Sequence, residues 1–124
     1  MKYYIGIDLG GTNIVAGVVD ENFSLIATAS NKTNAGRPAD QIAETMAQTA
    51  AQAAEKAGIS MEQIESVGIG SPGIVDSQKR EVIFASNLDF YNAPIGQLLE
   101  DRLHRPVFLA NDADAAAYGE FMAG

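Results

Sequence analysis

The stretch that most constrains this chain is Asp8-Leu9-Gly10-Gly11-Thr12, which separates two apolar runs, residues 3–7 and 14–19. Two such runs with so short a link predict adjacent strands joined by a tight glycine turn. Because glycine has no Cβ, the pair can adopt positive φ and let backbone N–H groups approach an anion closely. We therefore interpret Gly10, Gly11, Thr12 and Asn13, called the glycine loop below, as a candidate phosphate site. The alternative is an ordinary hairpin with a glycine turn.

A carboxylate ends the first predicted strand beside this loop. Asp8 would repel a bare phosphate, and a bridging Mg²⁺, held directly or through water, explains its position best. Thr12 and Asn13 add side-chain donors at the same corner. The sequence thus predicts a site for a phosphate together with its metal ion.

Composition limits the class of protein. A chain of 124 residues, of which 47% are hydrophobic, corresponds to about one domain with an ample core. The net charge of -8 disfavours a nucleic-acid or anionic-membrane surface, so a small ligand or soluble partner is expected. Cysteine is absent, which excludes disulfides and thiolate metal sites in these residues. With no signal peptide and no long apolar run in the sequence, a cytoplasmic location is expected.

Hydrophobic periodicity predicts an alternation of strands and helices. The third apolar segment, residues 24–30, alternates with polar residues and completes a three-stranded meander. An alanine-rich helix is expected between Pro38 and Gly58. Further along, we expect strands over 64–70 and 107–110, a short hairpin over 74–84, and helices over 94–103 and 113–122. His104 closes the second helix and is interpreted as structural.

The fourth predicted strand ends in a glycine-containing loop. Gly68, Gly70 and Gly73 match the spacing of a dinucleotide fingerprint, but that motif must open a helix. Residues 74–77 look like a strand instead, so a dinucleotide site is rejected. We interpret Ser71-Pro72-Gly73 as a backbone wall that a small polar ligand could approach.

Two polar pairs follow buried strands. Ser86 and Asn87 place a hydroxyl beside a carboxamide, which suits a polyol ligand, although turns use the same residues for themselves. Asn111 and Asp112 stand just before the last predicted helix, where either could serve as a helix cap. Capping needs only one of them, so Asp112 is a candidate base and Asn111 a candidate orienting group.

A helix N-terminus would keep the Asp112 carboxylate ionised and weakly basic. Phosphoryl transfer tolerates such a base, because its loose transition state mainly requires the nucleophile to be oriented. Asp114 is interpreted as a cap or a more distant neighbour of the site.

Four motifs in this order carry a resemblance to a known family. The stretches 8–13, 70–73, 86–88 and 111–120 resemble the ROK family of bacterial sugar kinases, especially its glucokinases. The resemblance implies an α/β fold of the ribonuclease-H-like, actin-type ATPase class. Its mixed five-stranded sheet would carry helices on both faces. The implied activity is ATP-dependent phosphorylation of a hexose, commonly at the 6-hydroxyl of glucose.

The resemblance also implies roles for individual residues. The glycine loop would bind the phosphates of ATP, and Asp8 would lie near Mg²⁺. Asp112 would be the general base and would also contact the sugar. The other residues expected to line the sugar are Gly73, Ser86, Asn87 and Asn111.

Kinases of this family continue into a second domain with further sugar ligands, a structural zinc motif and adenosine-binding segments. The resemblance therefore implies that residues 1–124 form an N-terminal domain, inactive on its own, of an enzyme that is a homodimer or tetramer. Two other classes stay open. One is a truncated ROK-type transcriptional regulator, although there is no room for a helix-turn-helix domain ahead of Tyr3. The other is a non-catalytic module that binds sugar or nucleotide.

Overall fold

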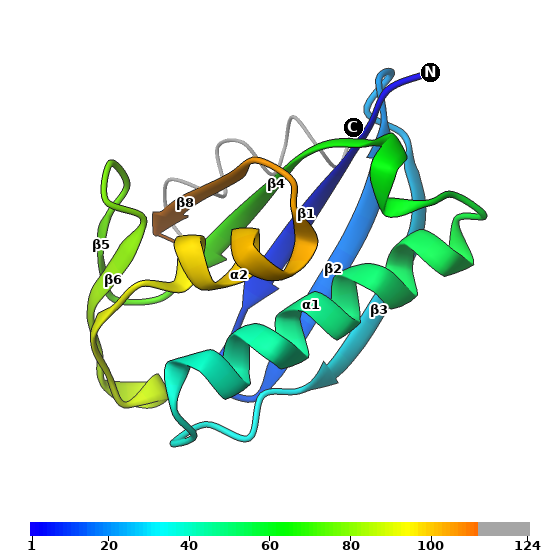
Figure 1. Ribbon diagram of the computed structural model, residues 1–124. Helices are drawn as coiled ribbons and strands as arrows, with labels where there is room; N and C mark the ends of the chain where they lie inside the picture. The colour runs from blue at the N-terminus through cyan, green and yellow to red at the C-terminus, as the bar shows by residue number, and fades with distance from the viewer. Residues whose placement is uncertain (112–124) are drawn as a thin grey trace.

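The computed structural model describes residues 1–111 of the chain, which form two β-sheets and two α-helices (Figure 1). Two of the three expected helices and all five expected strands of the main sheet are confirmed in this part, with bounds within two residues of those predicted. The predicted helix over 113–122 lies outside the described residues. The strands are β1 (Tyr3–Leu9), β2 (Asn13–Asp20), β3 (Leu25–Lys32), β4 (Ile64–Ser71), β5 (Ile74–Asp76), β6 (Glu81–Ala85), β7 (Phe90–Ala93) and β8 (Val107–Asn111), and the helices are α1 (Ala39–Lys56) and α2 (Ile95–Leu103).

The larger sheet has the strand order β3-β2-β1-β4-β8. The first three strands pair antiparallel, whereas β4 and β8 run parallel to β1, so the expected mixed five-stranded sheet is confirmed. Asp8 of β1 lies opposite Gly70 of β4, which in turn lies opposite Ala110 of β8. The carboxyl ends of the three parallel strands therefore meet at one edge of the sheet, where ligands of open α/β sheets commonly bind.

One face of this sheet carries the core. Side chains alternate along β1, so Ile5, Ile7 and Leu9 are buried on the same side. Ile42 and Met46 of α1 belong to the same buried cluster. Both described helices pack on this face, α1 over the antiparallel strands and α2 over β8 (Figure 1). No helix in this part of the chain is long and apolar enough to cross a lipid bilayer.

The opposite face bears a row of glycines. Gly6 lies between Gly17 of β2 and Gly68 of β4, and Gly68 lies opposite Phe108 of β8, which is 64% exposed. Within residues 1–111 no helix covers this face. The expectation of helices on both faces thus depends on residues 113–122, which lie outside the described residues.

The second sheet has three strands in the order β5-β6-β7. The predicted hairpin is β5 and β6, and β5 directly follows Gly73, which agrees with rejection of the dinucleotide motif. β7 was not expected from the sequence. Ile74, Phe84 and Tyr91 are neighbours across the three strands, and all three are exposed; we call them the apolar row. The rings of Phe84 and Tyr91 have centroids 5.4 Å apart.

Arg80, in the turn between β5 and β6, connects this small sheet to α2 and β8 through hydrogen bonds. One guanidinium nitrogen donates to Glu100 of α2 at 2.5 Å and to the backbone oxygen of Val107 at 3.2 Å. The other donates to Gln97 at 2.8 Å. A single side chain thereby joins the hairpin, α2 and the start of β8.

Candidate active site

The glycine loop is a compact turn between β1 and β2. The Gly10 N–H donates to the Asn13 carbonyl at 3.0 Å, which closes the turn. The expectation of positive φ is wrong here, since neither Gly10 nor Gly11 has it. Glycine is required because there is no room for a side chain: a Cβ on Gly10 would lie 2.8 Å from the Asn13 oxygen. A Cβ on Gly11 would lie 2.9 Å from Nδ2 of Asn87.

Thr33, just after β3, forms hydrogen bonds to this turn. Its role was not predicted from the sequence. Its hydroxyl donates to the Gly10 carbonyl at 2.7 Å, and its N–H donates to the Thr12 carbonyl at 2.9 Å. The side chain is completely buried. The pairing of Asn13 with Lys32 places residue 33 beside the loop, and this register is a property of the folded meander that no motif in the sequence indicates.

Asp8 is exposed on the face of β1 opposite the core, between Val15 and Gly70. Within the described residues, no three acidic, histidine or cysteine side chains are arranged so that they could hold a metal ion. A single exposed carboxylate fits Mg²⁺, which normally retains several waters and takes few protein ligands. Its metal role stays a prediction.

The predicted sugar residues Gly73, Ser86 and Asn87 lie close to one another on the small sheet. Gly73 has φ +87°, and a Cβ there would lie 2.1 Å from the Phe84 oxygen, so Gly73 packs directly against β6. Ser86 and Asn87 begin the short 3-10 turn Ser86–Leu88 that follows β6, and both are exposed. The proximity of Gly11 to the Asn87 amide brings the glycine loop next to this group.

The last predicted pair lies at the end of β8. Asn111 is partly buried and stands opposite Ser71, at the sheet edge that also carries Asp8. Asp112 and Asp114 lie outside the described residues. The structure thus gathers the glycine loop, Asp8 and Asn111 at one edge, with Asn87 adjoining the loop.

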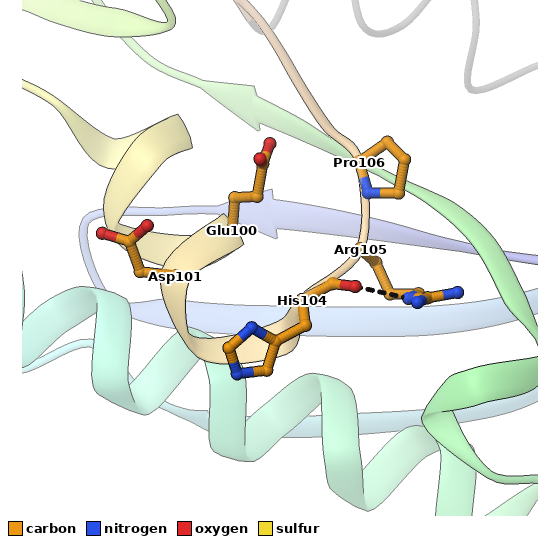
Figure 2. A pocket seen from close by; sticks show the side chains of 5 residues that line it. All are labelled: Glu100, Asp101, His104, Arg105 and Pro106. Atoms are coloured by element: carbon orange, nitrogen blue, oxygen red, sulfur yellow. Dashed lines mark hydrogen bonds between the residues drawn. The ribbon is translucent and has the colours of Figure 1, made fainter.

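A separate hollow lies at the opposite end of β8 (Figure 2). It has a volume of about 430 Å³ and is lined by Glu100, Asp101, His104, Arg105 and Pro106. The Arg105 Nε donates to the His104 carbonyl at 2.6 Å. His104 ends α2 with positive φ, in agreement with its structural interpretation. Because Val107 begins β8 and Asn111 ends it, this hollow is remote from the candidate site.

Known proteins provide an independent comparison. The chain is 41% identical over 124 residues to a glucokinase from Streptomyces coelicolor, covering all of this chain and 37% of that protein. It is 31% identical over 116 residues to a putative xylose repressor from a Caldicellulosiruptor species, covering 94% of this chain and 29% of the relative. Among solved structures, a ROK family glucokinase from Streptomyces griseus in complex with glucose and AMPPNP superposes with a TM-score of 0.84. That pair is 39% identical, over 98% of this chain and 37% of the other.

The sheet order, the parallel edge and these structural matches define a domain of the actin-like ATPase class. Residues 4–124 match the model of the ROK family, and the chain belongs to that family. The chain spans little more than a third of the length of the glucokinases that it matches.

Proposed function

We propose that this chain is the N-terminal part of an ATP-dependent hexose kinase. The observation that carries the proposal is the proximity of Gly11 to Asn87, because a Cβ on Gly11 would lie 2.9 Å from the Asn87 Nδ2; a candidate anion site thus lies beside a neutral amide. Phosphoryl transfer needs such neighbours, because the γ-phosphate and the sugar hydroxyl must meet in line. The glucokinase relatives support a sugar substrate, and glucose is the first to test.

In this proposal the glycine loop holds the ATP phosphates through backbone N–H groups, and Thr12 and Asn13 add side-chain donors. Asp8 holds Mg²⁺ directly or through water, and the ion supplies charge neutralisation at the phosphates. Neutral amide and hydroxyl groups bind the sugar hydroxyls. They come from Gly73, Ser86, Asn87 and Asn111.

Asp112 is the proposed general base and accepts the proton of the attacking hydroxyl. Asn111, one residue earlier, orients the same sugar. β8 delivers Asn111 to the edge where β1 delivers Asp8, since the two strands run parallel through β4, and Asp112 follows Asn111 directly in the sequence. Orientation of the nucleophile is the main requirement in a loose phosphoryl-transfer transition state.

The test is Asp112→Asn in the full-length kinase that this proposal implies. Asparagine retains the shape of the side chain but accepts no proton, so glucose-dependent ADP formation should fall about 10²- to 10⁴-fold. Glucose binding by calorimetry should persist. Asp114→Asn is the matched control and should keep turnover. Near-normal turnover of the Asp112 variant would remove that residue from the base role.

A regulator is the second candidate, favoured by the match to the putative xylose repressor. Such a protein would bind sugar without consuming ATP. Sugar binding by the full-length protein, combined with no ADP formation and sugar-dependent release of DNA, would select this alternative.

A further inference from the structure

Thr33 makes two hydrogen bonds to one turn although it is separated from that turn by all of β2 and β3. The hydroxyl bond to Gly10 measures 2.7 Å, and the backbone bond to Thr12 measures 2.9 Å. Folding of the meander is what brings the residues together, since β2 and β3 stay paired up to Asn13 and Lys32.

These bonds act on the orientation of peptide groups. A peptide unit is planar, so fixing the Gly10 carbonyl also fixes the N–H of Gly11 at its other end. Likewise, fixing the Thr12 carbonyl fixes the N–H of Asn13. Within the described residues no hydrogen bond uses the Gly11 N–H, which leaves it available to an anion.

Thr33 is itself held in place by the Arg37 side chain. Nη2 of Arg37 donates to the Thr33 carbonyl at 2.6 Å and to the Thr45 hydroxyl of α1 at 3.0 Å. Nε of Arg37 donates to the Asn34 carbonyl at 3.2 Å. A continuous chain of hydrogen bonds therefore runs from α1 through Arg37 and Thr33 to Gly10.

We infer that Thr33 is a positioning residue for phosphate binding, which holds the Gly11 N–H in its binding orientation. The inference rests on the proposed function for the identity of the nucleotide. Thr33 touches the loop and no reacting atom. Its removal therefore acts on the affinity for the phosphate-bearing ligand and leaves the sugar side unchanged.

The test compares Thr33→Val with Thr33→Ser in the full-length kinase. Valine keeps the branched shape but lacks the donor, so the KM for ATP should rise about two- to tenfold, the usual effect of one lost hydrogen bond. The KM for glucose and the kcat at saturating ATP should stay within twofold of wild type. Serine retains the hydroxyl donor, so the KM for ATP of Thr33→Ser should stay near that of the wild type.

Thr49→Val is the matched control. Thr49 is also completely buried, and its hydroxyl donates to the Thr45 carbonyl at 2.7 Å without contacting the loop. Both valine variants should lower the melting temperature, but only Thr33→Val should weaken the binding of ATP. If Thr33→Val does not fold, Arg37→Met provides a second test. It removes the hydrogen bond from Arg37 to the Thr33 carbonyl and should also raise the KM for ATP.

The outcomes separate this inference from the proposed function. An unchanged KM for ATP in Thr33→Val, or equal rises in the KM values for ATP and glucose, would overturn the positioning role. If the wild type binds ATP-Mg²⁺ in calorimetry without phosphorylating a sugar, and valine weakens that binding, the positioning role stands and the kinase proposal falls. A wild type that binds no nucleotide would overturn both.

Discussion

At Gly73 two constraints act on a single Cα. The backbone has φ +87°, and a Cβ would meet the Phe84 oxygen at 2.1 Å. Gly36 has the first constraint alone, with φ +97° and nothing within 4 Å. Gly36→Ala should therefore cost about 1 kcal/mol of unfolding free energy. Gly73→Ala should cost a further 1–3 kcal/mol, roughly, because the backbone must shift. Urea unfolding of the two variants measures both, and equal losses would contradict the contact with Phe84.

Gly10 and Gly11 should respond differently to alanine. At Gly10 the added carbon meets a backbone atom within the loop, the Asn13 oxygen. At Gly11 it displaces the Asn87 amide, which is a predicted sugar ligand. Gly10→Ala should thus raise the KM for ATP alone, and Gly11→Ala should raise both KM values, by about two- to tenfold for the sugar. Identical effects at the two positions would argue against a shared boundary between the phosphate and sugar sites.

The residue types of the loop could be predicted from sequence, but the reason for its glycines could not. Positive φ is the usual explanation for paired glycines, whereas here the neighbours of each Cα exclude a side chain. One of those neighbours, Asn87, lies far away in sequence, and periodicity carries no information about such contacts. Thr33 escaped notice for the same reason, since its partners belong to a different turn.

Among the elements, the small sheet depends on Arg80. Replacing Arg80 with Met removes its bonds to Glu100, Gln97 and the Val107 carbonyl. Both Arg80 and Glu100 are partly exposed, so we expect a loss of about 1–2 kcal/mol. The hairpin also carries Gly73 and leads into Asn87, so the KM for glucose should rise as well.

Arg102→Met is the matched control for that variant. Arg102 pairs with Glu44 at 3.0 Å and joins α2 to α1 without touching the hairpin. Both variants should lower the melting temperature, but only Arg80→Met should weaken the binding of glucose and so raise the KM for glucose. Equal glucose KM values in the two variants would show that Arg80 has no part in positioning the sugar residues.

Apolar runs and helical periodicity were sufficient to predict the main sheet and its covering helices, and β1 and α1 each bury one regular face. They were insufficient for β7. That strand has four residues, follows Asp89 in a left-handed conformation and contains another positive φ at Asn92. Its pairing with β6, rather than any internal pattern, makes it a strand.

At the scale of the whole molecule, the chain alone should fold without turning over substrate. The main sheet and its core are formed by residues 1–111, which predicts a cooperative thermal transition. Catalysis also requires the nucleophile and phosphate to be held in line, and such placement can contribute roughly 7–11 kcal/mol. The chain spans little more than a third of its glucokinase relatives, so we expect no glucose-dependent ADP formation from residues 1–124. Activity in a preparation free of host kinase would contradict this expectation.

The apolar row has a consequence for colloidal behaviour. Ile74, Phe84 and Tyr91 present an attractive surface, while a net charge of -8 makes copies of the chain repel one another. Salt shortens the range of that repulsion, to about 10 Å at 0.1 M ionic strength, but leaves the apolar attraction in place. Light scattering should therefore detect association that increases with salt, and Phe84→Ser with Tyr91→Ser should abolish the increase. The same chain would then be most soluble in dilute buffer, the reverse of the salting-in expected for proteins held together by surface charge pairs.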